Sequence, residues 1–350
     1  MKKLYWYQLI VFTIAFVALT SLVVLYDTSR EAVTETPYDT EEEYEEEYQE
    51  ETREDVPVEE VIEVEEPIEP IEIIFAGDLM MSGSIEYAVQ EFSVDYPFEF
   101  VKEEVQNADF AVVNLETAVT ERTDAFPKQF AFKMPPHFLE GVKNAGFDMV
   151  SLANNHTMDF KEAGLVDTIE HLQDYEIAHI GAGRNKKEAY AANVIEINDE
   201  SVAFLGFSRV LPDVSWYAGP DKPGIASGYQ LDRMERIIAE TAAEADYVLV
   251  YIHWGSELAE EPEPYQIEYA EVMINAGADA IVGTHPHVLQ PIEEYNGKPI
   301  AYSLGNFLFP DYVSGPTAET GLLKLILDDG DINVEFSEYL IEGNQVVEKE

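Results

Sequence analysis

The sequence predicts an α/β protein with a largely buried sheet, and two observations carry this prediction. Short runs rich in β-branched and aromatic residues recur from residue 73 to residue 310, with helix-like stretches between several of them. The runs are continuously apolar rather than alternating, which is typical of strands covered on both faces. With 350 residues, 46% of them apolar, the chain is long enough to bury a sizeable core.

The chain begins with an uncharged apolar segment at residues 4–26. At about 1.5 Å per residue, a helix of this length spans a bilayer core. Because Lys2 and Lys3 precede the segment, the positive-inside rule predicts a single-pass protein of the cell membrane, with its N-terminus cytoplasmic and its main domain extracellular. A cleaved signal peptide is the alternative, although no A-x-A site follows. Residues 1–27 are therefore assigned to a cytoplasmic stub and transmembrane anchor.

Residues 28–72 are predicted to be an acidic, disordered stalk. Residues 31–72 contain 20 acidic residues and one basic residue, Arg53. Such a segment repels itself and buries too little apolar surface to offset its chain entropy, so a spacer is expected, with a cation-binding tail as the alternative. Residues 73–350 are then the folded domain. The formal net charge of −50 argues against nucleic acid as a partner.

Strands and helices are expected to alternate through the folded domain. The expected strands lie in IEIIFAGD, ADFAVVNLE, FDMVSLANNH, SVAFLGFS, YVLVYIHWG, ADAIVGTHPH and PIAYSLGNF. The expected helices lie at residues 98–107, 136–145, 161–174, 230–245 and 265–276. After these, GLLKLILDDGDINVEFSEYLIEGNQVV predicts antiparallel strands, because DDGD and EGN are turn signals.

Polar side chains follow five of the expected strands, at the points where the strands end. They are Asp78, Asn114, Glu116, Asn154, Asn155, His156, His253, His285 and His287. In open α/β sheets, ligands bind outside the carboxyl ends of the strands, so these side chains are expected to share one site. Each signal is weak alone, since a single histidine at a strand end is usually structural and NNH also suits a turn or a helix cap.

The chemistry of these residues favours a divalent-metal site. The chain has no cysteine, so a metal would be held by imidazole, carboxylate or carboxamide groups, which suit Mn, Fe, Zn or Co. Such a set holds one ion, or two ions about 3.5–4 Å apart with a bridging carboxylate. In THPH, His285 and His287 would share a face if the segment is extended. His137, His171 and His179 are interpreted as structural or surface residues.

Several short motifs, in order, resemble the CapA/PgsA family of capsule and poly-γ-glutamate synthesis proteins, a branch of the calcineurin-like metallophosphoesterases. The motifs are FAGDLM, VVNLET, SLANNHTMDF, HIGAGRN, YIHWGSE, VGTHPHV and YSLGNFLF, within residues 71–310. The resemblance implies a four-layer αββα sandwich of metallophosphoesterase type. It also fits an N-terminal membrane anchor.

The resemblance also implies roles for individual residues. Asp78, Glu116, Asn155, His253, His285 and His287 would be ligands to one or two ions, most simply Mn, Fe or Zn. His156 would donate a proton to a leaving oxygen, positioned by Asp159, as the catalytic pair. Where the superfamily has D-x-H, this chain has Asp78-Leu79-Met80, and a thioether is a poor ligand for a hard ion. The first ion would therefore bind weakly or be absent.

Further residues are expected around this centre. Lys133 in FAFKMPP and Arg184 in GAGRN would bind an anionic substrate, with surface turn residues as the alternative interpretation. Asn114, Asn154 and Asn306 would not bind the metal themselves but would orient its ligands or a water through hydrogen bonds.

Three functions remain open from the sequence. The first is a part in the synthesis or export of capsular poly-γ-glutamate or a related polymer, with other membrane components of a synthase or exporter as partners. The metal site would then bind the anionic polymer or a phosphorylated intermediate. The second is a metal-dependent phosphoesterase or other hydrolase acting on an extracellular ester. The third is a non-catalytic, metal-stabilised binding module, so whether the protein is an enzyme stays open.

Overall fold

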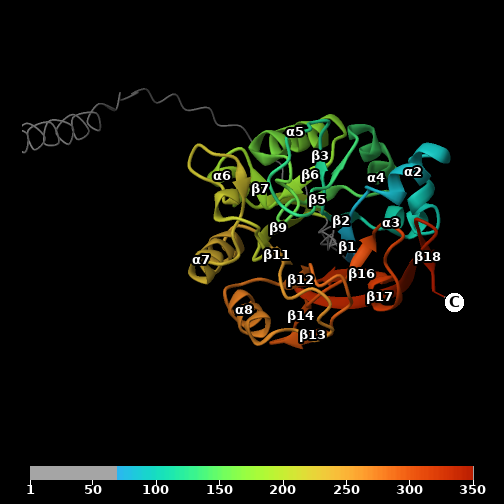
Figure 1. The fold of residues 1–350 in the computed structure, drawn as a ribbon. Helices are drawn as coiled ribbons and strands as arrows, with labels where there is room; N and C mark the ends of the chain where they lie inside the picture. The colour runs from blue at the N-terminus through green and yellow to red at the C-terminus, as the bar shows by residue number, and fades with distance from the viewer. Residues whose placement is uncertain (1–68, 350) are drawn as a thin grey trace, which may run out of the picture. The chain divides into compact units, whose positions relative to one another are not determined.

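The computed structural model describes residues 69–349, which form two large sheets with helices on their outer faces (Figure 1). The first sheet has eight strands in the order β18-β17-β16-β1-β2-β5-β6, with β15 beside β1. Its strands are β1 (Ile71–Leu79), β2 (Phe110–Leu115), β5 (Met149–Ser151), β6 (Ala178–Ile180), β15 (Asn306–Leu308), β16 (Glu319–Asp328), β17 (Asp331–Glu342) and β18 (Gln345–Glu348). Parallel and antiparallel pairs are mixed, which confirms the α/β class.

The second sheet has six strands in the order β13-β14-β12-β11-β9-β8. Its strands are β8 (Asn193–Ile197), β9 (Glu200–Ser208), β11 (Tyr247–His253), β12 (Ala280–Thr284), β13 (Ile292–Tyr295) and β14 (Lys298–Ala301). Two short ribbons pair β3 (Ala118–Val119) with β4 (Lys133–Met134), and β7 (Ala182–Gly183) with β10 (Gly224–Ile225).

The helices divide between the two outer faces. Those packed on the first sheet are α2 (Ser84–Glu91), α3 (Lys102–Asn107), α4 (Leu139–Ala145) and α5 (Lys161–Asp174). Those packed on the second sheet are α6 (Lys186–Ala189), α7 (Leu231–Ala242) and α8 (Pro264–Asn275). The order of layers is thus helices, sheet, sheet, helices.

Strand alternation explains why the apolar runs are continuous. In β1, Ile73 and Phe75 point into the core between the sheets, while Ile74 and Ala76 point toward the helices α2–α5. In β11, Leu249 enters the central core and Val250 faces α7 and α8. Both faces of each central strand are buried, so both must be apolar.

Most expected elements are present, with shifted ends. The stretch 161–174 is one helix, as predicted, and 230–245 and 265–276 correspond to α7 and α8. The stretches 98–107 and 136–145 are each divided into a 3₁₀ turn and a short α-helix, and α2 was not predicted. The antiparallel C-terminal strands are confirmed, and their turns contain Asp329, Gly330, Gly343 and Asn344 at positive φ, as the turn signals require.

The predicted localisation needs a correction. Within residues 69–349, no helix is long and apolar enough to cross a bilayer, which contradicts the predicted single-pass protein. The proposed anchor at residues 4–26 and most of the proposed stalk at 28–72 lie outside the described residues. Strand β1 begins at Ile71, two residues before the predicted start of the domain.

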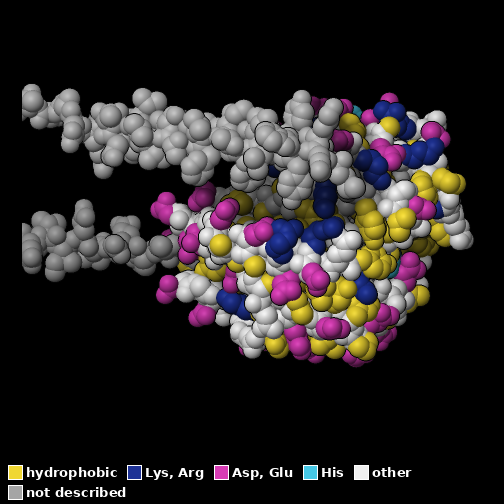
Figure 2. Space-filling view, turned by 90° about the vertical axis from the view of Figure 1, so that its left-hand side faces the viewer, with side chains coloured by type: hydrophobic (Ala, Val, Ile, Leu, Met, Phe, Trp, Pro, Cys, Tyr) yellow, Lys and Arg dark blue, Asp and Glu magenta, His cyan; other side chains and the backbone are white. Residues whose placement is uncertain are grey.

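The described surface is uneven in charge. On the face drawn in Figure 2, acidic side chains are spread widely, whereas Lys and Arg gather in a few places beside apolar side chains.

Candidate metal centre

The ends of strands from both sheets meet at one buried cluster. Asp78 lies at the end of β1, and Glu116 directly follows β2 in the same sheet. His253 ends β11, and His285 directly follows β12 in the second sheet. All four residues are at most 4% exposed. The predicted convergence of strand ends is therefore found, and it joins the two sheets.

A close backbone approach places Asp78. Its N–H donates to the carbonyl of Gly305 at 2.9 Å, which fixes the end of β1 against the segment before β15. A Cβ on the preceding residue, Gly77, would lie 2.2 Å from that same carbonyl oxygen. Only glycine fits there, so close packing explains the glycine of FAGD.

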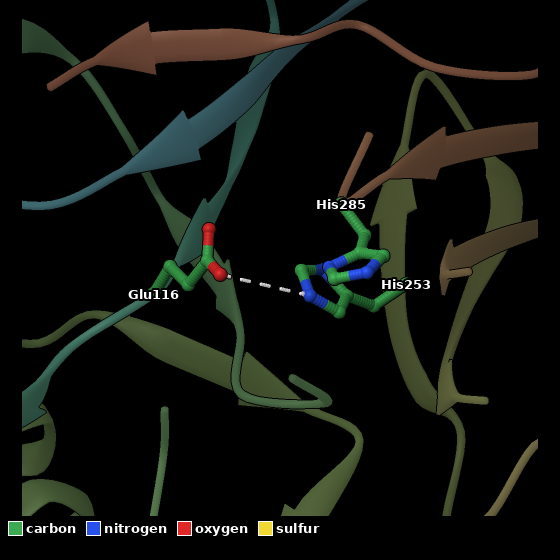
Figure 3. A group of neighbouring side chains, drawn as sticks. All are labelled: Glu116, His253 and His285. Atoms are coloured by element: carbon green, nitrogen blue, oxygen red, sulfur yellow. Dashed lines mark ion pairs between the residues drawn. The ribbon is translucent and has the colours of Figure 1, made fainter. Parts of the chain in front are cut away.

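Glu116 is the least satisfied group of the cluster. Neither of its carboxylate oxygens has a hydrogen-bond partner among the described residues, and the side chain is fully buried. Its Oε1 faces His253 Nε2 at 3.7 Å (Figure 3). One ligand atom each from Glu116, His253 and His285 lies within 4.8 Å of the others. This group therefore has the spacing of a metal site, and Glu116 makes no hydrogen bond to either imidazole.

Two further groups of the same spacing overlap the first. Asp78, Glu116 and His287 form one, and Glu257, His285 and His287 form the other. Glu116 belongs to two groups that use different histidines, which is the position of a bridging carboxylate. Glu257 is exposed and was not predicted, although it follows His253 by four residues in HWGSE.

The two buried carboxylates differ in their environments. Burial works against ionisation of Asp78, but its hydrogen bond and ion pair with His287 prevail and lower its pKa to about 2. Burial raises the pKa of Glu116 well above its ordinary value, and the negative charge of Asp78 raises it further. Asp78 is thus ionised and hydrogen-bonded, whereas Glu116 needs a cation beside it to hold its charge.

The three imidazoles also differ. Burial lowers the pKa of His253 well below its ordinary value, and burial together with the charge of His287 lowers that of His285 to about 4. For His287, burial is outweighed by the negative charges of Glu116 and Asp78, so its pKa rises to about 9. His253 and His285 are therefore neutral at neutral pH, which is the form that binds a metal.

The segment THPH is not extended, so the condition under which alternation would bring its two imidazoles onto one face is not met. His285 has φ of 100° and His287 has φ of 59°, so both residues lie in the left-handed region that non-glycine residues seldom adopt. Their ring centres are nevertheless 5.8 Å apart, and the His285 N–H donates to Asp78 Oδ2 at 3.1 Å. The imidazoles meet through a strained turn rather than through alternation along a strand.

The asparagines predicted around the centre all lie in its hydrogen-bond network. Asn114 donates to Asp78 Oδ1 at 2.7 Å and accepts from Asn154 at 3.0 Å. Asn306 Oδ1 lies 2.9 Å from His287 Nδ1. Asn155 Oδ1 lies 2.9 Å from His253 Nε2, so this predicted ligand lies against the ring that it would accompany. Asn154 Oδ1 also accepts from the N–H groups of residues 156 and 157, which forms the turn of NNHT.

His156 and Asp159 form the predicted pair beside this network. His156 Nδ1 lies 2.8 Å from Asp159 Oδ2, and Asp159 is fully buried. Lys128, which was not predicted, pairs with Asp159 Oδ1 and lies 3.1 Å from His156 Nδ1. Burial lowers the pKa of both His156 and Lys128, although Asp159 works against this in each case.

The two predicted substrate-binding cations are engaged elsewhere. Lys133 donates to the backbone carbonyls of Glu121 and Arg122, at 3.3 and 2.7 Å. Arg184 donates to Gln173 at 3.2 Å and lies 4.0 Å from Glu188. In residues 69–349, neither makes a polar contact with the cluster. The lysine that reaches the site is Lys128, five residues before Lys133 and in the segment that leads into β4.

Met80 lies among apolar side chains. It is 1% exposed and packs in a small apolar cluster with Phe309 and Ile341. The position where the superfamily has a histidine is therefore part of the core in this chain.

Two facing sheets whose strand ends enclose neutral imidazoles and an unpaired buried carboxylate define an α/β protein with a candidate divalent-metal centre. Residues 72–311 match the sequence pattern of the family described as bacterial capsule synthesis protein PGA_cap. The chain belongs to this family.

Two curated relatives are similar over most of the chain. The capsule biosynthesis protein CapA of Bacillus anthracis is 33% identical over 268 residues, which are 75% of this chain and 65% of that protein. The PGA biosynthesis protein CapA of Bacillus subtilis (strain 168) is 33% identical over 238 residues, 67% of this chain and 62% of that protein. The chain thus spans less than two thirds of each.

Solved structures are more distant. The protein TT1561 of Thermus thermophilus is 11% identical, with a TM-score of 0.40, over 76% of this chain and 98% of that one. The sulfate thiohydrolase SoxB of Thermus thermophilus is 12% identical, with a TM-score of 0.44, over 76% of this chain and 45% of that one.

Proposed function

We propose that this chain takes part in the synthesis or export of capsular poly-γ-glutamate, or a related polymer, through a divalent-metal site of metallophosphoesterase type. Membership of the capsule synthesis family supports a part in making or exporting such a polymer, as do the names of the two relatives. Its partners would be other components of a polymer synthase or exporter. One observation carries the metal site: the buried carboxylate of Glu116 has no partner among the described residues and faces two neutral imidazoles.

The residues present fit a divalent ion of the Mn, Fe or Zn type. Glu116, His253, His285, Asp78 and His287 would hold it, with Asn155 beside His253. Two overlapping groups allow one or two ions. When bound, such an ion lowers the pKa of a water and polarises a phosphoryl or carbonyl oxygen.

The chain's own residues orient these donors and supply charge beside them. Asn306 and Asn114 orient His287 and Asp78. Asp159 holds both His156 and Lys128, so a cation and an imidazole lie side by side next to Asn155. A phosphoryl or carboxylate group of a substrate would therefore find positive charge from Lys128.

The first test is the metal content of the full chain, measured by elemental mass spectrometry after Mn²⁺ or Zn²⁺ loading. We expect one or two ions per chain, and loss of most of them in the double variant His285→Ala with His287→Ala, because one or both of these residues occur in each of the three donor groups. His137→Ala with His171→Ala is the matched control, since neither residue occurs in a donor group. Equal metal content in both double variants would contradict the site.

A second candidate function is hydrolysis of a phosphoester, and the His156–Asp159–Lys128 arrangement favours it. Lys128 lies 3.1 Å from the ring of His156, so a proton source is available even though the ring is neutral at rest. The substrate would be a phosphorylated intermediate of the polymer or another ester.

Turnover of a generic aryl phosphodiester by the full chain with Mn²⁺ tests this function. His156→Ala is expected to lower kcat by about 100-fold or more, the usual contribution of a general acid or base. Lys128→Met should also lower kcat, whereas Lys133→Met, which removes a cation from the adjoining strand β4, should leave it unchanged. A wild-type rate that equals the rate with His156→Ala would overturn the catalytic pair.

A further inference from the structure

A groove of about 920 Å³ lies between α6 and α7, on the outer side of the second sheet. Figure 2 shows Lys and Arg side chains gathered over apolar ones on this face. The charged and apolar side chains that form it include Lys186, Lys187, Arg233, Arg236, Val194 and Ile237. The groove shares no residue with the metal centre.

The groove is basic in a strongly acidic protein. It contains four of the chain's 20 Lys and Arg residues, against two acidic residues, Glu240 and Glu244. Only Arg236 is neutralised, by Glu240 at 2.8 Å. Within residues 69–349, the other three cations have no carboxylate partner within 4 Å. A concentration of unpaired cations in a shallow hollow attracts an anion.

One of these cations is held in position. Arg233 donates to the Tyr190 hydroxyl at 3.1 Å and lies 5.3 Å from the centre of that ring. The same hydroxyl accepts from the N–H of Ser227 at 2.8 Å. A guanidinium fixed in this way loses less freedom when it binds a carboxylate.

The groove also has an apolar wall and a strand edge. Val194 is 50% exposed and belongs to β8, which is the edge strand of the six-stranded sheet. Ile237 lies on the opposite wall, from α7. An edge strand offers backbone groups to an extended chain, and apolar walls take up aliphatic segments between charges.

We propose that the groove between α6 and α7 binds an acidic peptide, a flexible chain whose carboxylates pair with Lys186, Lys187 and Arg233. Its aliphatic segments would lie on Val194 and Ile237. A nucleic acid suits the groove less well, because Tyr190 is the single aromatic side chain lining it and the protein around it is negative. The proposal does not depend on the metal centre.

Fluorescence anisotropy of a labelled oligoglutamate peptide with the full chain at low salt tests this site. Lys186→Gln with Lys187→Gln is expected to weaken binding about fivefold, the effect of losing two exposed ion pairs. Added salt should weaken wild-type binding as well. The matched control is Lys102→Gln with Lys143→Gln, which removes the same charge from α3 and α4, on the outer side of the other sheet.

Each outcome decides the proposal. Weakening in the groove variant alone supports it. It is overturned if the peptide does not bind, if both lysine pairs matter equally, or if an oligonucleotide of equal charge binds as tightly. His285→Ala with His287→Ala should leave peptide binding intact, even if the metal-site proposal fails. Loss of binding in that variant would place the peptide at the metal centre instead and would overturn the proposal that the groove binds it.

Discussion

Stripped of metal, the Glu116→Gln variant is expected to be more stable than the wild type by about 2 kcal/mol at neutral pH. The wild type buries a carboxyl group without a hydrogen-bond partner among the described residues. Without the ion, this group must either bury its charge or take up a proton at neutral pH, whereas an amide of the same shape does neither. With metal present the order should reverse. The ion then stabilises the wild type by mass action, while the variant has lost the residue shared by two donor groups.

The stability of the metal-free protein should also depend on pH, because Glu116 titrates differently in the folded and unfolded states. The folded-state pKa of Glu116 is raised, so its contribution is intact below 4.5, the ordinary value of the group, and is lost as the pH rises toward the folded value. The metal-free wild type should therefore lose stability from acidic to neutral pH, and the variant should lose less. Urea unfolding with and without a chelator measures both. A variant that is less stable than the metal-free wild type at neutral pH would contradict an unpaired carboxylate.

Gly283→Ala is expected to destabilise the protein by more than about 3 kcal/mol and to abolish metal binding. A Cβ at this position would lie 2.0 Å from the carbonyl oxygen of Tyr302 and 2.4 Å from Trp254 Nε1. Those two atoms are hydrogen-bonded to each other at 2.9 Å in the core. Neither Tyr302 nor Trp254 can move away without separating β12 from β14, its partner strand. Strand β12 leads directly to His285, so the metal ligands would be displaced as well.

The control for this variant is Gly297→Ala. Gly297 has φ of 77° and nothing within 4 Å of an added Cβ, so only backbone strain of about 1–2 kcal/mol is expected. Thermal unfolding and metal content of both variants distinguish crowding from strain. Similar losses of stability in the two variants would mean that the close approach at Gly283 is relieved by a small shift.

The main features of the site follow from local patterns in the chain. Apolar strands that end in Asp78, His253 and THPH predict a polar cluster, because the ends of parallel strands meet at one edge. Asn114, Asn154 and Asn155 were predicted to belong to the site for the same reason, because each follows one of the expected apolar strands. Lys128 was missed in favour of Lys133, because the two are close in the sequence and the direction of each side chain depends on what packs against it.

The sequence by itself determined most of the central strands and longer helices, where the site-bearing strands end and which family the motifs resemble. These depend on hydrophobic period, turn residues and short motifs, all of which are local. The tertiary structure decided that Glu116 has no partner among the described residues, that His285 and His287 meet through left-handed backbone, and that Lys186, Lys187 and Arg233 surround one groove. Burial and charge pairing arise between segments far apart in the chain, so no local pattern records them.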